Sequence, residues 1–184
     1  MDLVCLKSLS LSDIEIAGRR ARAELNAKTA QGKHYSFVLQ LAYEMPLPSH
    51  CLPVLRLAFC MPLLNYGLFT HKIFFDFPLS EADNVLLQQL NQIFSRDIFV
   101  NKILRRRAPY IRPQFLPQED GIHPGDSSPK ATIVPRAVLP TRPLDGQVTA
   151  DACGVLSSGG KESLLTYGLL KEISDNIHPL YVNE

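Results

Sequence analysis

The sequence predicts an α/β protein with two structured parts joined by a linker. Residues 1–108 are expected to form an N-terminal α+β domain, residues 109–150 a Pro-rich linker, and residues 151–184 the first βαβ unit of a parallel sheet. Three observations predict this organisation. Hydrophobic residues alternate with a period of two early in the chain, prolines crowd its middle, and a glycine-rich loop separates two short apolar runs near its C-terminus.

The N-terminal domain is predicted to contain an antiparallel pair of strands. Large side chains occupy every second position of residues 35–43, which is the period of a strand with one buried face. The residues predicted to share that face are Tyr35, Phe37, Leu39, Leu41 and Tyr43. A glycine-containing turn would let residues 13–26 and 34–44 pair as neighbours. A further apolar run, residues 73–77, is expected to be a strand that ends at Pro78.

A helix is predicted to follow Ser80. Ser80 has the side chain of an N-cap residue, and Asp83 stands three residues on, as in a capping box. Apolar residues then recur at three- and four-residue spacing, and the pattern continues after a bend near residues 95–97. The residues expected to form the buried face are Leu86, Leu90, Ile93 and Phe94, followed by Val100, Ile103 and Leu104. The arginines at 105–107 suit the negative end of a solvated helix better than contact with phosphate or nucleic acid.

Eight of the fourteen prolines lie between residues 109 and 143. Proline removes a backbone donor and favours extended chain, so this stretch predicts a linker that contains the domain boundary. Within it, residues 132–134 could add a short edge strand.

The composition indicates which binding partners and which cellular compartment to expect. The formal net charge of +1 provides no general attraction to nucleic acid or to an acidic membrane surface. The four cysteines form no C-x-x-C pair, which predicts reduced, mostly buried thiols and no metal site. Residues 52–69 are the most hydrophobic stretch, but Arg56, Pro62 and Gly67 interrupt it, so it falls short of a membrane span. The first residues lack the pattern of a signal peptide, so a cytoplasmic protein is expected.

Six residues near the C-terminus carry the clearest functional signal. They are Ser158, Gly159, Gly160, Lys161, Glu162 and Ser163. An apolar strand, residues 153–157, is predicted before them, and a helix at 164–173 and a second strand at 178–182 after them. Adjacent glycines let the backbone approach a ligand closely, and the helix N-terminus directs unpaired N–H groups and a positive dipole at the loop. The arrangement therefore predicts phosphate binding.

The loop does not have the order of a Walker A motif. Gly154 and Gly159 have the required spacing, but a Walker A motif then needs Lys and Ser or Thr. Here the next residues are Gly160, Lys161 and Glu162.

The six residues are instead similar to S-G-G-x-D-S, the signature of the PP-loop ATP pyrophosphatases, the adenine nucleotide alpha-hydrolase-like superfamily. The similarity covers residues 153–184, and Glu162 replaces the aspartate of the signature. The resemblance implies a Rossmann-like sheet and a site for ATP and Mg²⁺. It also implies that a substrate oxygen attacks the α-phosphate, so that pyrophosphate leaves and an adenylated substrate forms.

The resemblance further implies roles for the residues of the loop. Ser158, Gly159, Gly160 and Ser163 would hold the β- and γ-phosphates. Lys161 and Glu162 would belong to the same nucleotide site, Lys161 as a helping cation and Glu162 near the metal or the helix dipole. Asn183 or Glu184 would approach the adenosine. No residue is indicated as catalytic, and His178, which precedes a proline, is expected to be structural.

Two functional interpretations remain open. In the first, the chain is the N-terminal portion of an ATP-dependent, AMP- and pyrophosphate-forming ligase or transferase, and retention of the glycines and serines favours this one. In the second, it is a non-catalytic accessory or partner-binding protein with a remnant nucleotide loop. A lone βαβ unit leaves much apolar surface uncovered. We therefore expect a truncated domain, a homodimer formed through this region, or a sheet completed by the N-terminal strands.

Overall fold

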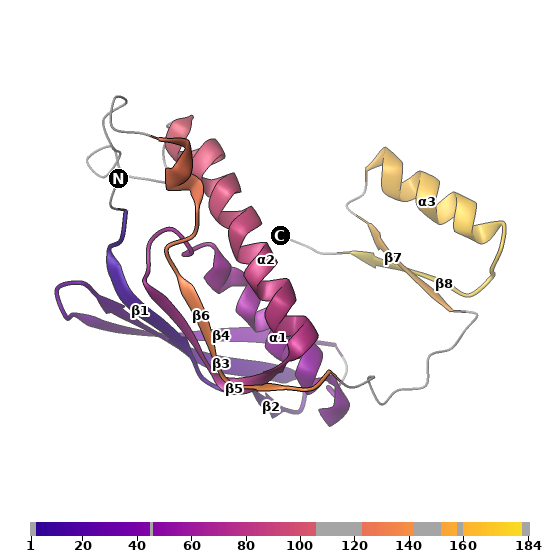
Figure 1. Ribbon diagram of the computed structural model, residues 1–184. Coiled ribbons are helices and arrows are strands. Elements are labelled where there is room, and N and C mark those ends of the chain that lie inside the picture. The colour runs from indigo at the N-terminus through magenta and orange to yellow at the C-terminus, as the bar shows by residue number, and fades with distance from the viewer. Residues whose placement is uncertain (1–2, 45, 106–122, 142–151, 158–159, 182–184) are drawn as a thin grey trace. The chain divides into compact units, whose positions relative to one another are not determined.

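The computed structural model describes residues 3–44, 46–105, 123–141, 152–157 and 160–181 (Figure 1). The chain divides into two compact units, Met1–Pro143 and Leu144–Glu184, and each is described by itself. Helices and strands occur in both units, so the mixed α/β class expected from the sequence is confirmed.

The N-terminal unit is built on one mixed six-stranded sheet. Its strands are β1 (Leu6–Leu11), β2 (Glu15–Ala17), β3 (Arg20–Thr29), β4 (His34–Ala42), β5 (Lys72–Ser80) and β6 (Thr132–Leu139). The order across the sheet is β2-β3-β1-β5-β6, and β4 pairs with the remaining edge of β3. β3 is antiparallel to β1, β2 and β4, whereas β5 is parallel to β1 and β6.

Two helices cover one face of this sheet (Figure 1). α1 (Leu52–Leu64) follows a short 3-10 turn, η1 (Ser49–Cys51), and α2 (Glu81–Ile98) follows β5 directly. Alternate strand residues point toward the helices and form the core with them. This core includes Leu9, Leu11, Ile73, Phe75 and Phe77 from the strands and Leu63, Leu64 and Leu87 from the helices. Among the described residues, no helix is both long and apolar enough to cross a membrane.

The predicted antiparallel pairing of β3 with β4 is confirmed, but the predicted burial of the apolar face of β4 is wrong. The exposed fractions are 49% for Tyr35, 53% for Phe37, 41% for Leu41 and 38% for Tyr43. Only Leu39 of this set packs against the core. The alternation does place these side chains on one face. Their neighbours across the strand pair are mainly alanines of β3, which are too small to cover them.

The predicted N-cap of α2 is confirmed. The Ser80 hydroxyl accepts a hydrogen bond from the Asp83 N–H at 3.0 Å. The same hydroxyl lies 2.7 Å from the Asp83 carboxylate and donates to it. This second bond differs from the capping box, in which the carboxylate accepts from the N-cap backbone.

The buried face of α2 differs in part from the predicted one, since Leu90 and Phe94 do pack against the core. Leu87, Asn91 and Ser95 are buried, whereas Leu86 and Ile93 are exposed. The expected bend near residues 95–97 is also absent from the described helix. α2 instead passes at its end into a wider π turn, η2 (Phe99–Leu104), which buries Phe99 and Ile103 and leaves Leu104 exposed.

A glycine explains why two polar residues face the core. Gly67, after α1, approaches α2 so closely that a Cβ at this position would lie less than 3.0 Å from both Asn91 Oδ1 and Ser95 Oγ. The Gly67 carbonyl accepts hydrogen bonds from the N–H groups of Lys130 and Ala131, each at 2.9 Å. Asn91 Nδ2 donates to the Ala131 carbonyl at 3.2 Å. This cluster joins the end of α1, the middle of α2 and the start of β6.

Part of the predicted linker belongs to the sheet. The short edge strand expected at 132–134 exists and is longer, because β6 continues to Leu139. Before it lies a 3-10 turn, η5 (Pro124–Ser127), so the linker prediction is wrong for residues 123–139. β5 likewise continues through Pro78, where the β5–β6 register shifts and a missing backbone N–H is tolerated. Residues 109–122 and 142–150 lie outside the described residues.

The C-terminal unit has the predicted βαβ order. β7 (Cys153–Ser157) leads through the loop to α3 (Lys161–Lys171), and β8 (Ile177–Tyr181) returns parallel to β7. Val155 and Ile177 are buried between the elements. The large apolar side chains left exposed on α3 and after it are Leu164, Leu165, Leu169 and Ile173.

An ion pair joins the β1–β2 connection to α1. Arg56 donates from Nε to Asp13 Oδ1 at 2.8 Å and from Nη2 to Asp13 Oδ2 at 2.5 Å. The Arg56 guanidinium also lies 5.4 Å from the centre of the Phe77 ring. Partial burial of the Asp13 carboxyl raises its pKa, but the hydrogen bonds from Arg56 and the Ile14 N–H, together with the charges of Arg56 and Arg136, outweigh burial, so the net pKa lies below its ordinary value of 3.8.

We predict that Gly67→Ala destabilises the N-terminal unit by about 1–3 kcal/mol, because the new methyl group overpacks the contact with Asn91 and Ser95. Urea unfolding of the full chain measures the change. Gly125→Ala is the matched control, since a Cβ there meets nothing within 4 Å and should change stability by less than about 0.5 kcal/mol. Equal unfolding midpoints for the two variants would contradict the proposed packing.

We predict that Asp13→Asn lowers the free energy of unfolding by about 1 kcal/mol at pH 7. The lowered pKa means that the stabilisation is present above pH 3.8 and is lost as the pH falls through the folded-state value. The variant and the wild type should therefore converge in stability once the pH falls below the folded-state pKa of Asp13, as urea titrations at decreasing pH can show. Glu15→Gln is the control, because its pair with Arg22 is exposed on both sides and should contribute little. A difference that persists at low pH would contradict the ionic origin of the effect.

Candidate functional site

The candidate site is the start of α3, where the glycine-rich loop meets the helix. β7 ends at Ser157 and α3 begins at Lys161, so the loop lies at the carboxyl end of a parallel strand. Ligands of open α/β sheets bind at this end of the strands. Ser158 and Gly159 lie outside the described residues, and so does the side chain of Glu162. The structure therefore places three of the six motif residues in detail: Gly160, Lys161 and Ser163.

Gly160 is the N-cap residue of α3 and has an extended backbone, with φ −81° and ψ 168°. Serine, threonine or aspartate at this position would normally accept a hydrogen bond from a first-turn N–H. Glycine has no side chain to do so, and the structure has no side-chain cap here. The first N–H groups of a helix have no partner inside it, so a helix start with a glycine N-cap is a position suited to an anion.

Ser163 holds the end of the loop to the helix. Its hydroxyl donates to the Gly160 carbonyl at 2.9 Å, and the Leu164 N–H donates to the same oxygen at 3.2 Å. These two bonds fix the peptide that follows Gly160 and with it the direction of the next N–H group. The sequence analysis gave Ser163 a direct bond to phosphate. That contact stays a prediction, and in this structure the hydroxyl supports the shape of the loop.

The charges of α3 are arranged along its axis. Lys161 is exposed at the first position of the helix, and Lys171 lies in the last turn with its Nζ 5.9 Å from the Tyr167 ring centre. The helix dipole makes the first turn positive, and Lys161 adds a full charge beside it. The same turn also contains Glu162, whose negative charge offsets that of Lys161, so the backbone dipole is the net positive contribution at the loop.

Two hollows lie elsewhere among the described residues. One, of about 450 Å³, is lined by residues 171–176 at the opposite, negative end of α3, where the dipole disfavours an anion. The other, of about 890 Å³, lies in the N-terminal unit against α2 and η2, with Ile93, Arg96 and Phe99 among its lining residues and His123 facing them. Sequence reasoning missed the second hollow, because its walls come from the outer face of α2 and from a segment predicted to be linker.

The cysteines and histidines offer no competing site in the described part of the chain. All four cysteines are free thiols as expected, but only Cys60 is fully buried, and Cys5 is exposed. Burial raises the pKa of Cys60 far above its ordinary value, and the charge of Asp83 adds to this effect, so the thiol stays protonated. His178 lies 2.8 Å from Asn176 Oδ1, a local contact between exposed side chains. Within the described residues, no group of three His, Cys, Asp or Glu side chains is placed to hold a metal ion.

Comparison with known proteins leaves this site to be interpreted from its own chemistry. The chain matches no protein-family model and no curated protein sequence.

Proposed function

We propose that the β7–α3–β8 unit binds the β- and γ-phosphates of ATP and serves an AMP- and pyrophosphate-forming adenylation reaction. One observation supports this function most directly: Gly160 starts α3 without a side-chain cap, immediately after a loop at the end of a parallel strand. The motif residues Ser158, Gly159, Gly160, Lys161, Glu162 and Ser163 provide the resemblance to PP-loop ATP pyrophosphatases that specifies the reaction.

The backbone supplies the chemistry that such a reaction needs. When a substrate oxygen attacks the α-phosphate, negative charge builds on the oxygen that bridges it to the β-phosphate and on the departing pyrophosphate. N–H groups held in place before the reaction stabilise that charge without reorganisation. The bonds from Ser163 and Leu164 to the Gly160 carbonyl keep the helix start in one conformation, which is the preorganisation required. Lys161, exposed at the same end, would neutralise part of the phosphate charge.

Mg²⁺ would accompany ATP in this reaction and would neutralise charge on the phosphates. Glu162 is the acidic residue of the motif and the first candidate to face the metal. Because its side chain lies outside the described residues, we assign it no step. The adenylated substrate is likewise left unassigned.

We predict that the full chain binds ATP and pyrophosphate more tightly than AMP, because the loop holds the β- and γ-phosphates that AMP lacks. Isothermal titration calorimetry with the three ligands in the presence of Mg²⁺ tests this order. Tighter binding of AMP would place recognition on the nucleoside instead and would contradict the assigned role of the loop.

We also predict that Gly160→Val weakens ATP and pyrophosphate binding by about tenfold or more. The added side chain blocks close approach to the backbone and removes at least one charge-assisted hydrogen bond. Gly168→Val is the matched control, since Gly168 lies in the middle of α3 and a Cβ there meets nothing within 4 Å. If the two variants bound ATP and pyrophosphate with equal affinity, the loop would not be the phosphate site. The alternative, a non-catalytic accessory protein, would then be favoured.

A further inference from the structure

Strand β4 has an outer edge with which no strand pairs in the described part of the chain. On its inner edge, the Tyr43 N–H donates to the Arg19 carbonyl and the Thr29 N–H donates to the Lys33 carbonyl, each at 2.9 Å. Antiparallel strands bond to one another through alternate residues. The odd-numbered residues of β4 therefore bond to β3, and the even-numbered residues direct their N–H and C=O groups outward.

The outer edge of β4 lacks the features that normally prevent edge pairing. Its nine residues include no Asp, Glu, Lys, Arg, Pro or Gly. The other edge strand of the sheet, β6, carries Pro135 and Arg136, and β2 is only three residues long. Short strands, prolines and charges are the usual protections of an edge. In the described sheet, β4 is thus the edge suited to an additional strand.

We propose that β4 is a homodimer interface, at which it pairs antiparallel with β4 of a second copy about a two-fold axis through Val38. Val38 is the midpoint of His34–Ala42 and has an even number, so its backbone groups face outward. Centring the pair there places every even-numbered residue opposite an even-numbered residue of the second copy. All the outward N–H and C=O groups then form reciprocal hydrogen bonds, as the antiparallel ladder requires.

The same register matches the side chains on both faces of the strand. On the helix-covered face, Tyr35 comes beside Leu41 of the second copy, and Phe37 beside Leu39. These are positions where antiparallel side chains approach most closely, and aromatic and aliphatic residues pair well there. On the other face, Val38 meets Val38 at the axis. The exposed apolar side chains of β4 would then be covered by the same side chains of the second copy, as in an isologous interface.

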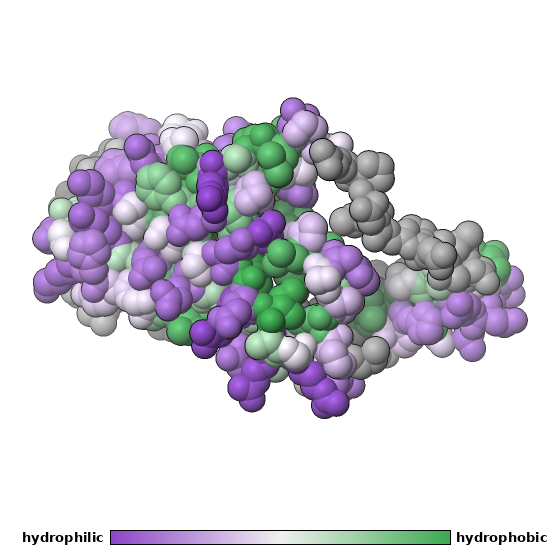
Figure 2. Space-filling model, turned by 90° about the horizontal axis from the view of Figure 1, so that it is seen from below, coloured by the Kyte–Doolittle hydropathy of each residue, from purple (hydrophilic) through white to green (hydrophobic). Residues whose placement is uncertain are grey.

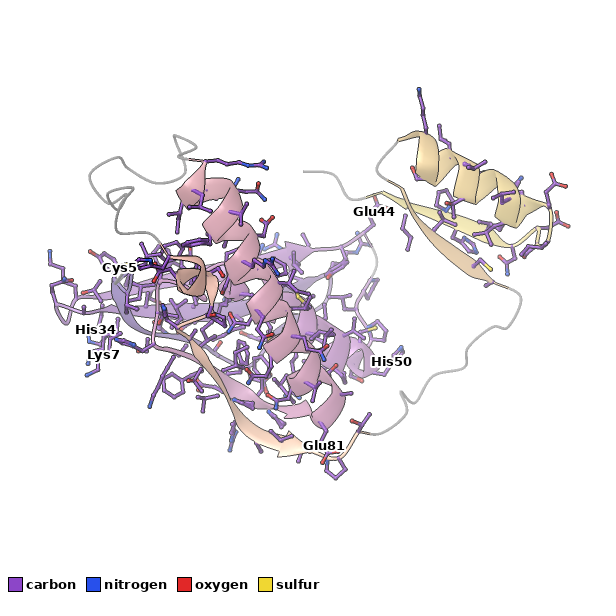
Figure 3. All side chains as sticks on the ribbon, turned by 45° about the horizontal axis from the view of Figure 1, so that its top comes forward. Cys5, Lys7, His34, Glu44, His50 and Glu81 are labelled. Atoms are coloured by element: carbon purple, nitrogen blue, oxygen red, sulfur yellow. The ribbon has the colours of Figure 1, made fainter. Side chains whose placement is uncertain are left out.

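The charges at the two ends of β4 also favour a second copy in this orientation. Lys33 and His34 stand at its start and Glu44 just beyond its end, all exposed, and Figure 3 shows His34 and Glu44 at opposite ends of the strand. A two-fold antiparallel arrangement brings the basic end of one copy to the acidic end of the other. Figure 2 shows apolar surface that the unit exposes between its polar side chains on one face. This interface belongs to the N-terminal unit and does not depend on nucleotide binding.

Sedimentation velocity of the full chain over a range of concentrations tests the proposal. The wild type should show a monomer–dimer equilibrium, and Val38→Lys should weaken dimerisation by about tenfold or more, because two like charges then face each other at the axis. Within its own sheet Val38 pairs with Glu24, so lysine at this position remains compatible with folding. Val85→Lys is the matched control, since Val85 on α2 is exposed to 54% and lies outside β4. This control should dimerise as the wild type does.

A charge-swap experiment tests whether the two-fold axis passes through Val38 and controls for variants that fail to fold. Val38→Lys and Val38→Glu should each be monomeric alone, and an equal mixture should form a heterodimer, because unlike charges then meet at the axis. Recovery of dimer by mixing also shows that both variants are folded. A monomeric wild type, or a Val38→Lys variant that dimerises as well as the wild type, would overturn the proposal. So would a dimer that is lost only in Leu165→Lys, because it would place the interface on α3.

Discussion

The completion of backbone hydrogen bonds is the constraint on which this structure depends. Strands and helices fold because nearly every buried N–H and C=O group finds a partner. In the N-terminal sheet, hydrogen bonds between neighbouring strands meet this requirement. The Gly67 carbonyl accepts hydrogen bonds from the N–H groups of Lys130 and Ala131, and these bonds connect the start of β6 to the end of α1. Two further places carry the proposals: the start of α3, where an anion is proposed to bind the backbone, and the outer edge of β4, with which no strand pairs among the described residues.

The packing of the N-terminal unit shows where local sequence patterns stop being sufficient. The period of two in β4 correctly predicted the strand, its partner and the shared face. It did not predict exposure, because burial depends on the alanines that happen to lie beside it on β3. On α2, the predicted buried face did not include Asn91 or Ser95. Both are buried because Gly67, distant in sequence, has no side chain to keep α2 away.

Prolines misled the sequence analysis in two different ways. In residues 109–143 they suggested a linker, yet Pro135 lies in β6 at an edge of the sheet, where its missing N–H costs little. α1 was not recognised, because Pro62 lies inside it and its mostly apolar residues, apart from Arg56, give no clear helical period. The βαβ unit was predicted closely, since its glycines, short strands and apolar helix are all local signals. The role of Ser163 in bracing the Gly160 carbonyl was not, because it depends on the folded turn.

The central claim is that the backbone at the start of α3 binds phosphate, and its most direct test observes those amides themselves. Backbone ¹H–¹⁵N spectra of the full chain, recorded during titration with pyrophosphate, report on each N–H group separately. The account predicts that the largest shifts occur at Gly160 and Lys161, that both N–H protons move downfield as they bond to an anion, and that the resonances of β4 stay in place. Saturation with the largest shifts elsewhere, or no shift at Gly160 and Lys161, would contradict it.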